Sequence, residues 1–445
     1  MAILTKEEAK ALLAKVMAFS KAEECEARLS GSEQGNIRYA LNAVSTAGDV
    51  STLSLFVSST YGKKTASASI NEFDDASLEK VVRRAEELAR LAPDNPERMP
   101  ALGPQDIKDN PAQFINSTAA LTPEKRAEMV GQSIKAAKEA KLEAAGFLVN
   151  TSGFSAMMNS KGLYAYDKST NVNFSVTTRN ADGTGSGYAA KGFNDVNKMD
   201  TLAATKVAAS KANGSVGAKA IEPGKYTVIL EPLAAAYIME NMFGGFDARS
   251  ADEGRNYMSK PGGANRLGEQ LFDEKVNIYS DPFHPDLPGS TWTGEGQPVN
   301  KMHWVEKGVV KNLGYSRYWA QRKNVAAVPG PSNIIMDGTN ASLEDLIKGT
   351  EKGILVSRFW YIRLVDAQSM LLTGLTRDGT YYIENGQIKY PIKNMRFNES
   401  PVIMLNNVDA LGRQERTIGT ESGRSLLIPA MRIRDFTFTS LSDAV

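Results

Sequence analysis

Histidine and cysteine, the side chains that most often bind zinc or act as nucleophiles, are scarce in this chain. Its 445 residues include one cysteine, Cys25, and two histidines, His284 and His303. A single cysteine excludes an intrachain disulfide and a cluster of thiolate ligands. Acidic residues flank it in the segment AEECE, and they favour the neutral thiol over a nucleophilic thiolate. A zinc site built from histidine ligands alone needs three of them, one more than the chain contains.

Long apolar runs and an excess of one charge are also missing. No apolar run approaches the roughly 20 residues that a membrane-spanning helix needs. The 52 basic and 51 acidic residues leave a net charge of +1, so charge gives no reason to expect a nucleic acid or an anionic membrane as a partner. The N-terminal segment lacks the long apolar stretch of a signal peptide, and we therefore expect a cytoplasmic protein.

The composition is typical of a globular protein, with 42% apolar and 23% charged residues. The chain is too long for one simple core, and a proline-rich connector near 95–110 and glycines after 212 are candidate boundaries. We predict an α+β fold. Its N-terminal domain, 1–220, combines helices with an antiparallel sheet and has a possible further boundary near 95–110. A strand-rich domain over 221–445 follows, shaped like a barrel or a sandwich.

Periodic apolar residues and capping signals predict the helices of the N-terminal domain. They are expected from the start of the chain to Phe19 and over 75–91, 122–141 and 202–212. The strand patterns are shorter, for example Glu26–Leu29 and Gly35–Leu41, and a polar break over 42–49 follows them. In the C-terminal domain, Asn385-Gly386 between two apolar runs predicts a tight hairpin.

One stretch of the C-terminal domain, Gly224–Gly263, places a carboxylate inside an apolar helix. The run Tyr226–Leu230 predicts a buried strand, and Pro232 then opens a helix that ends at two glycines. This helix is almost entirely apolar apart from Glu240. A buried carboxylate is costly unless it is paired, bound to a metal or catalytic. Glu240 is therefore either a general base, as in a zinc-peptidase helix, or a structural acid paired with an arginine or with backbone.

Several stretches along nearly the whole chain resemble the TldD/PmbA family, the bacterial proteins called modulators of DNA gyrase. The resemblance lies in the helix around Glu240, in 286–320 with its DLPGSTWTGEG sequence, in 371–397 with its ENG turn, and in 419–438, which begins GTESGRS. The family is associated with proteolysis by a metalloprotease assembly of two related subunits, TldD with zinc and PmbA, or TldE, without it.

The resemblance implies a zinc motif His-Glu-x-x-x-His in the active branch, and its ligand positions are degenerate here. Met239 stands at the first histidine position and Gly244 at the second. Gly419 or Thr420 stands where the zinc-bearing branch has a cysteine. Only Glu240, at the general-base position, keeps the residue of the motif. The resemblance thus implies the metal-free PmbA/TldE-like branch, with no cofactor.

Three functions are compatible with these observations. In the first, the chain is the zinc-less subunit of a metallopeptidase assembly and helps to enclose unfolded or extended peptides, as a homodimer or with a zinc-bearing homologue. In the second, it is an active peptidase whose metal site draws on Glu240, both histidines and the acids Asp247, Asp252 and Glu253. In the third, it is a non-enzymatic homodimeric scaffold that binds peptides. The sequence identifies neither the peptide nor the partner, and leaves open whether the chain is an enzyme.

Three further segments have alternative interpretations. The run Arg358–Tyr361 mixes a cation with aromatic rings, which either line a peptide groove or pack between sheets. The arginines Arg249 and Arg255, beside the acids after the predicted helix, belong either to a loop that reaches a cavity or to a solvated loop. Glu295, in the glycine-rich turn TGEGQP, is either a metal ligand or an ordinary turn residue.

Overall fold

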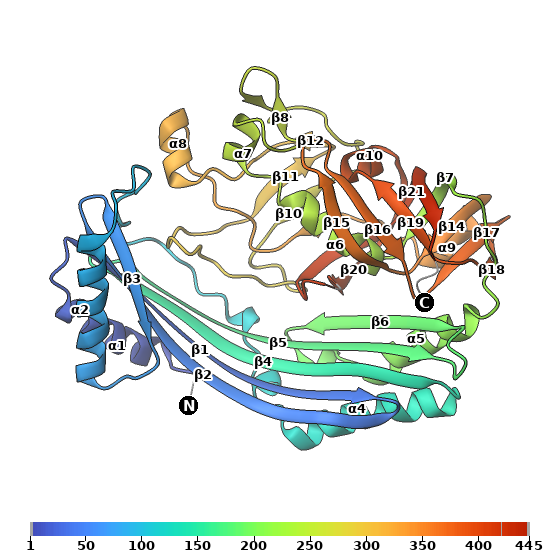
Figure 1. Ribbon diagram of the computed structural model, residues 1–445, viewed down its shortest axis with the longest axis horizontal. Coiled ribbons are helices and arrows are strands. Elements are labelled where there is room, and N and C mark those ends of the chain that lie inside the picture. Colours follow the sequence, from blue (N-terminus) through green and yellow to red (C-terminus); the bar gives the residue numbers. More distant parts are fainter. Residues whose placement is uncertain (1–2, 420, 443–445) are drawn as a thin grey trace.

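Two β-sheets and the helices around them make up the fold (Figure 1). The computed structural model describes residues 3–419 and 421–442. Within them, residues 24–193 form a long, curved six-stranded sheet, and residues 224–441 form a branched sheet of thirteen strands. The C-terminal sheet and its loops lie over the concave face of the curved sheet, which is the lower element of Figure 1.

The N-terminal sheet is antiparallel throughout, in the order β3-β2-β1-β4-β5-β6. Its strands are β1 (Glu24–Ala40), β2 (Ala43–Tyr61), β3 (Lys64–Ile70), β4 (Glu143–Asn159), β5 (Tyr164–Arg179) and β6 (Ser186–Phe193). Along β4 and β5, buried and more exposed residues alternate over much of the length. One face of the sheet therefore packs against helices, and the other is available to solvent or to the C-terminal part.

The strands are longer than the sequence pattern predicted, and this corrects the expected break at 42–49. That segment belongs to β2, and the chain reverses at Leu41-Asn42 instead. Both residues have positive φ, 49° and 58°, as a two-residue type I′ hairpin requires. Exposed serines and threonines suit a strand without giving hydrophobic alternation, so the pattern hid this half of β2. Strands β4 and β5, which also contain serines and threonines, each run unbroken over sixteen or seventeen residues.

Two groups of helices cover one face of the curved sheet. They are α1 (Lys6–Phe19), α2 (Asp75–Leu91), α3 (Asn116–Ala119), α4 (Pro123–Glu139) and α5 (Thr201–Gly214), with 3₁₀ turns at Pro111–Gln113 and Val196–Lys198. The pair α1 and α2 packs at one end of the sheet, and α4 and α5 pack at the other (Figure 1). The side chains of Thr5, Asp74 and Thr122 cap α1, α2 and α4.

The C-terminal sheet is organised around its longest strand, β21 (Ser425–Leu441), which pairs with β7, β13, β19 and β20. Its other strands are β7 (Gly224–Leu230), β10 (Ile278–Ser280), β11 (Met302–Glu306), β12 (Val309–Val310), β13 (Ile335–Met336), β14 (Lys352–Val356), β15 (Phe359–Asp366), β16 (Leu371–Thr376), β17 (Thr380–Glu384), β18 (Gln387–Pro391), β19 (Met395–Glu399) and β20 (Val408–Ile418), and a small hairpin is formed by β8 (Ser259–Lys260) and β9 (Ala264–Asn265). In the described residues this branched sheet does not close into a barrel, so the sandwich-like alternative is the one observed.

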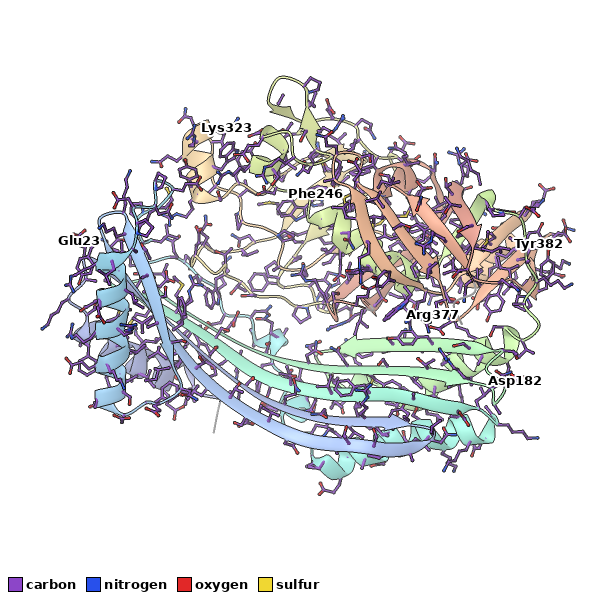
Figure 2. All side chains as sticks on the ribbon, viewed as in Figure 1. Glu23, Asp182, Phe246, Lys323, Arg377 and Tyr382 are labelled. Atoms are coloured by element: carbon purple, nitrogen blue, oxygen red, sulfur yellow. The ribbon has the colours of Figure 1, made fainter. Side chains whose placement is uncertain are left out.

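Five short helices accompany this sheet in the described part of the chain. They are α6 (Pro232–Phe243), α7 (Ala248–Asp252), α8 (Arg317–Lys323), α9 (Leu343–Lys348) and α10 (Pro401–Asn406). Helix α6 lies inside the main core, near the ring of Phe246 that Figure 2 labels. The predicted α+β class is confirmed. No helix among residues 3–419 and 421–442 is long and apolar enough to cross a membrane.

The hairpin at Asn385-Gly386 is also confirmed, since both residues have positive φ and join β17 to β18. The apolar run over 354–364 is divided between β14 and β15. Arg358 lies at this division, 3.8 Å from the ring of Tyr188 on β6, and the Phe359 ring packs 4.4 Å from that of Phe397. Arg358 thus packs between the two parts of the chain and Phe359 packs within the C-terminal core, whereas Tyr361 is 55% exposed.

Candidate functional site

Helix α6 forms where the sequence predicted it. Pro232 occupies its first turn, and the chain leaves it at Gly244 and Gly245. Gly245 packs against the ring of Tyr257 so closely that a β-carbon would overlap it. The Tyr257 hydroxyl donates to the carbonyl of Met242 at 2.7 Å, which satisfies one of the last carbonyls of the helix. The short helix is therefore held firmly on its buried side, and this fixes the direction of Glu240.

Glu240 is half-buried, and its carboxylate is held by a loop that comes from the other end of the C-terminal domain. The hydroxyl of Ser422 lies 2.8 Å from Oε1 and 2.7 Å from Oε2. Burial raises the pKa of Glu240 above its ordinary value, while the bond from Ser422 and the charge of Arg424 act in the opposite direction. The partner of this acid is thus a serine, with an arginine nearby, rather than the arginine pair or the backbone cap that the structural interpretation named.

Gly419 lies directly against the same carboxylate. A β-carbon at this position would stand 2.5 Å from Oε2 of Glu240. Gly419 is the last described residue before Thr420, which lies outside the described residues, and its N–H donates to the carbonyl of Arg424 at 2.8 Å. The fold thus brings together Glu240 and Gly419, two positions that are 179 residues apart in sequence.

The other two degenerate ligand positions are elsewhere. Met239 is fully buried in the main core of the C-terminal domain. Gly244 is the exposed residue at the end of α6, and its N–H bonds to the carbonyls of Glu240 and Asn241. Residues five apart on a helix are separated by roughly 140° around its axis. Met239 and Gly244 therefore face in different directions.

These residues do not suit zinc. Zinc in proteins takes thiolate, imidazole or carboxylate ligands, usually four in a closed site and three in a catalytic one. The degenerate positions offer one thioether and two glycines around a single carboxylate. Among residues 3–419 and 421–442, no group of three or more His, Cys, Asp or Glu side chains is placed to hold a metal ion.

The other proposed ligands are engaged separately. Asp252 accepts hydrogen bonds from Trp319 Nε1 at 2.8 Å and from Asn265 Nδ2 at 2.7 Å. Glu253 pairs with Arg249 at 2.9 Å and with Arg255 at 2.6 Å. These contacts hold the loop that follows α6 onto α8 and β9, so its charges have structural partners.

The remaining candidates are also distributed over the domain. Asp247 caps α7 through the N–H of Ser250 at 2.8 Å, and His284 accepts from the N–H of Asp286 at 3.2 Å in a turn. His303 is exposed on β11, with its ring 5.6 Å from that of Tyr279. Glu295 sits in a turn at the opening of a cavity of about 430 Å³ that it shares with Cys25. Burial raises the pKa of the Cys25 thiol to about 11.

Sequence reasoning missed the residues that surround Glu240. Ser422 and Arg424 belong to the loop between β20 and β21. In the sequence, the segment GTESGRS that contains this loop indicated only that a cysteine ligand is absent. A loop rich in glycine and serine before a long apolar strand is a hairpin signal. It does not indicate which distant side chain the hairpin contacts, because that depends on how β21 passes beside α6.

Three family models match consecutive parts of the chain. They are described as PmbA/TldA metallopeptidase domain 1, over residues 25–89, the central domain, over residues 116–222, and the C-terminal domain, over residues 223–440. The chain belongs to the TldD/PmbA family. The resemblance found in the sequence is therefore confirmed, together with its metallopeptidase-like character.

Curated relatives of this family are distant from the chain. A metalloprotease of Methanothermobacter thermautotrophicus is 24% identical over 318 residues, which are 64% of this chain and 67% of that protein. A metalloprotease of Archaeoglobus fulgidus is 23% identical over 45% of this chain and 48% of its own. Metalloprotease PmbA of Escherichia coli O157:H7 is 22% identical over 38% and 37%. The matches to the last two span less than half of those relatives.

Solved structures agree over almost the full length. TldE from Thermococcus kodakarensis has a TM-score of 0.86 at 17% identity, covering 98% of this chain and 100% of the other. A Thermotoga maritima protein, named provisionally as a modulator of a DNA gyrase, gives the same TM-score, identity and coverage. At this identity the likeness establishes the fold of this TldD/PmbA-family chain and not its activity.

Proposed function

We propose that this chain is the zinc-less subunit of a metallopeptidase assembly. It pairs with a zinc-bearing homologue, and the two together enclose a space that admits unfolded or extended peptides. The observation that carries the proposal is the state of the site around Glu240. The general-base carboxylate is kept, but it is bonded to Ser422 and faces Gly419, and the other positions of the motif supply no ligand. A carboxylate without a metal-bound water has little chemistry of its own to perform on a peptide bond.

The concave face of the curved sheet supports a role in holding peptides. Its opposite face carries the apolar residues that pack on α4 and α5, so alternation turns polar side chains toward the C-terminal part. One row across the strands is Gln34, Thr151 and Asn171, which are direct neighbours in the register. Serines and glycines such as Ser32 and Gly153 line a hollow of about 280 Å³ on the same face. Hydroxyl and amide groups of this kind bond to backbone without selecting one side chain.

The free edge of β2 supports pairing with another subunit. Strand β3 pairs with β2 only from Leu55 to Tyr61, so residues 43–54 form an edge with no strand beside it in the described part of the chain. Residues 43–52 are all exposed, and 43–54 include no lysine, arginine or proline. Proteins usually protect long edges with such residues. We propose that a strand of the partner subunit pairs with this edge.

Metal content and mass in solution test the proposed role. When the protein is purified from its own cells, a second family member that contains zinc is expected to purify with it. After the two chains are separated, this chain is expected to contain no zinc. Zinc at about one ion per isolated chain would contradict the proposal and favour an active peptidase. A homodimer that binds peptide and has no zinc-bearing companion would instead support the scaffold.

A charged substitution on β2 tests whether this edge is the contact with the partner subunit. Val50 is 54% exposed on β2, and Val50→Lys is expected to weaken the assembly at least about tenfold because an ammonium group disfavours strand addition. The control is Val207→Lys on α5, where valine is 48% exposed and far from the edge in the fold. Light scattering across a dilution series measures the assembly. Equal assembly of both variants would show that the edge is not the contact.

A further inference from the structure

A small pocket between the curved sheet and the C-terminal domain contains an arginine without a counter-charge. The pocket has a volume of about 250 Å³. Its walls come from β5, from the turn after β6 and, on the other side, from β20 and the loop that carries Ser422. Arg416 on β20 lines the pocket. Ser425 on β21 also lines it, and Ser425 pairs across the hairpin with Ile418, two residues after Arg416.

The guanidinium of Arg416 is held through Nη1 and has a free donor at Nη2. Its Nη1 donates to Oδ1 of Asn194 at 3.1 Å and to the backbone carbonyl of Asp286 at 2.7 Å. Its Nε is buried and has no hydrogen-bond partner among the described residues, and the structure gives Nη2 no bond to any of them either. Because Nε is enclosed by protein, Nη2 is the donor that a carboxylate in the pocket is able to reach, through a charge-assisted hydrogen bond.

Comparison with the buried Arg126 and Arg358 shows that the surroundings of Arg416, which is partly buried, are unusual within the molecule. Three arginines have a buried, unpartnered Nε in the described part of the chain: Arg126, Arg358 and Arg416. The first is paired with the carboxylate of Asp49 and the second with that of Asp378. No described carboxylate lies within ion-pair distance of Arg416. Burial lowers its pKa to about 10, and the charge of Asp286, which is itself paired with Lys198, offsets this only in part.

Other polar groups around this pocket also lack partners. The hydroxyl oxygens of Ser425 and Ser332 are buried and unbonded among the described residues, as is the side-chain oxygen of Gln113, which is 8% exposed. Buried polar atoms are usually satisfied, and each exception needs an explanation. Two hydroxyls without an acceptor, and an amide oxygen that lacks a donor, thus gather around one hollow beside Arg416, which has no carboxylate partner; a ligand in the hollow is able to complete such a site.

We propose that this pocket binds a carboxylate, the C-terminal carboxylate of a peptide, through Nη2 of Arg416, with the side chains of Ser425 and Ser332 beside it. This rests on the proposed peptide-holding function. The guanidinium of Arg416, with the exposed Arg424 at the same pocket, favours an anion, and the volume fits the end of a chain rather than a long segment. Ser169 and Asn171 line both this pocket and the concave face, so a peptide extended over that face reaches it.

The pocket and the Glu240 site share one loop. Gly423, Arg424 and Ser425 line the pocket, while Ser422 of the same loop holds the carboxylate of Glu240. A peptide end bound by Arg416 is thus close in the fold to the degenerate site, which gives this chain a way to set the position of a peptide relative to the assembly.

Calorimetric titration with three peptides tests the proposal on the full chain, in whichever assembly it purifies. The first is a short N-acetylated peptide of Ala, Ser, Thr and Gln with a free C-terminus. The second is its C-terminal amide, and the third is the amide with one internal glutamate. The free acid is expected to bind the wild type about tenfold or more tightly than the amide, because charged hydrogen bonds are stronger than neutral ones.

The variants are Arg416→Gln and, as a matched control on the same strand, Arg413→Gln, whose side chain is exposed. Arg416→Gln is expected to remove the preference for the acid, and Arg413→Gln to keep it. Circular dichroism and a urea titration check that both are folded, and the comparison of acid with amide on the wild type does not depend on either variant.

Each outcome is decisive. Equal binding of acid and amide by the wild type overturns the carboxylate pocket while leaving peptide binding in place. No binding of any peptide overturns the proposed peptide-holding function together with this inference. Binding of the glutamate amide as tight as that of the free acid supports the carboxylate chemistry and identifies the source as an acidic side chain.

Discussion

The two parts of the chain contact each other through two arginines with different surroundings, the buried Arg358 and the partly buried Arg416. Arg358, near the end of β6, is paired with Asp378 at 3.2 Å and lies 3.8 Å from the Tyr188 ring and 4.8 Å from that of Trp360. Asp378 also accepts a hydrogen bond from Ser186. Arg377 lies at this junction as well, between the C-terminal part and β6 (Figure 2). Arg416 has an amide and a carbonyl as its partners and faces a pocket.

The difference separates a structural contact from a candidate binding site. Loss of contact with water destabilises the charged form of both arginines, and it lowers the pKa of each. At Arg358 a carboxylate of the same chain offsets part of that cost, and aromatic rings exclude water. At Arg416 the missing carboxylate leaves a charge that a ligand is able to neutralise. Unpaired buried charge, rather than burial alone, is therefore the feature that points to function here.

The largest expected effect lies at the structural contact. Asp378→Asn keeps the shape of the side chain and tolerates the positive φ of 56°, but leaves Arg358 buried and unpaired. We expect a loss of about 3 to 5 kcal/mol in the free energy of unfolding, measured by urea titration. Glu128→Gln, which breaks an exposed ion pair with Lys125, is the control and should cost less than about 1 kcal/mol. Similar losses for the two variants would remove the distinction between the contacts.

The next effect concerns the packing of the loop that the pocket shares with Glu240. Gly419→Ala places a methyl group against the Glu240 carboxylate, so we expect a loss of about 1 to 3 kcal/mol. Gly131→Ala in α4, where the added methyl meets no atom within 4 Å, should instead stabilise the helix by up to about 1 kcal/mol. A stable Gly419→Ala variant would mean that the loop moves away from Glu240 at little cost.

A smaller effect on stability is expected at the open pocket. Arg416→Gln loses two hydrogen bonds but also removes a buried charge that has no partner carboxylate, and these contributions oppose each other. The free energy of unfolding should change by about 1 kcal/mol at most, well below the change for Asp378→Asn. A loss as large as that of Asp378→Asn would assign Arg416 a structural role and weaken the case for a ligand.

The smallest effect is the pH dependence at Glu240. Because its pKa is higher in the folded chain than the ordinary value of 4.5, the folded state binds this proton more tightly than the unfolded state does. Its contribution to stability is therefore fully present below pH 4.5 and falls as pH rises through the raised pKa. Glu240→Gln should match the wild type in urea midpoint at pH 4 and exceed it slightly at pH 8. A variant less stable than the wild type at pH 8 would show that the charged form is the favoured one.

Much of the fold followed from local patterns. The helix α2 has the bounds 75–91 that its apolar spacing predicted, and α6 begins at Pro232 and ends before two glycines as expected. These elements are periodic and have strong start and stop signals. The first half of β2 was not predicted from the sequence, because its residues are exposed and show no alternation of apolar and polar side chains. Alternation of apolar and polar residues arises from burial of one face of a strand, so this pattern does not indicate a strand that is exposed on both faces.

The candidate site divides in the same way. The amino-acid sequence by itself determined that a lone acid, Glu240, lies in an apolar helix, and that the positions expected to hold zinc are Met239, Gly244 and Gly419. Only the tertiary structure decided that Gly419 and Ser422 meet that acid while Met239 faces the core, and that Arg416 is partly buried without a carboxylate partner. Composition counts charges, but pairing depends on which distant strands become neighbours, and burial then sets the energy of a charge left alone.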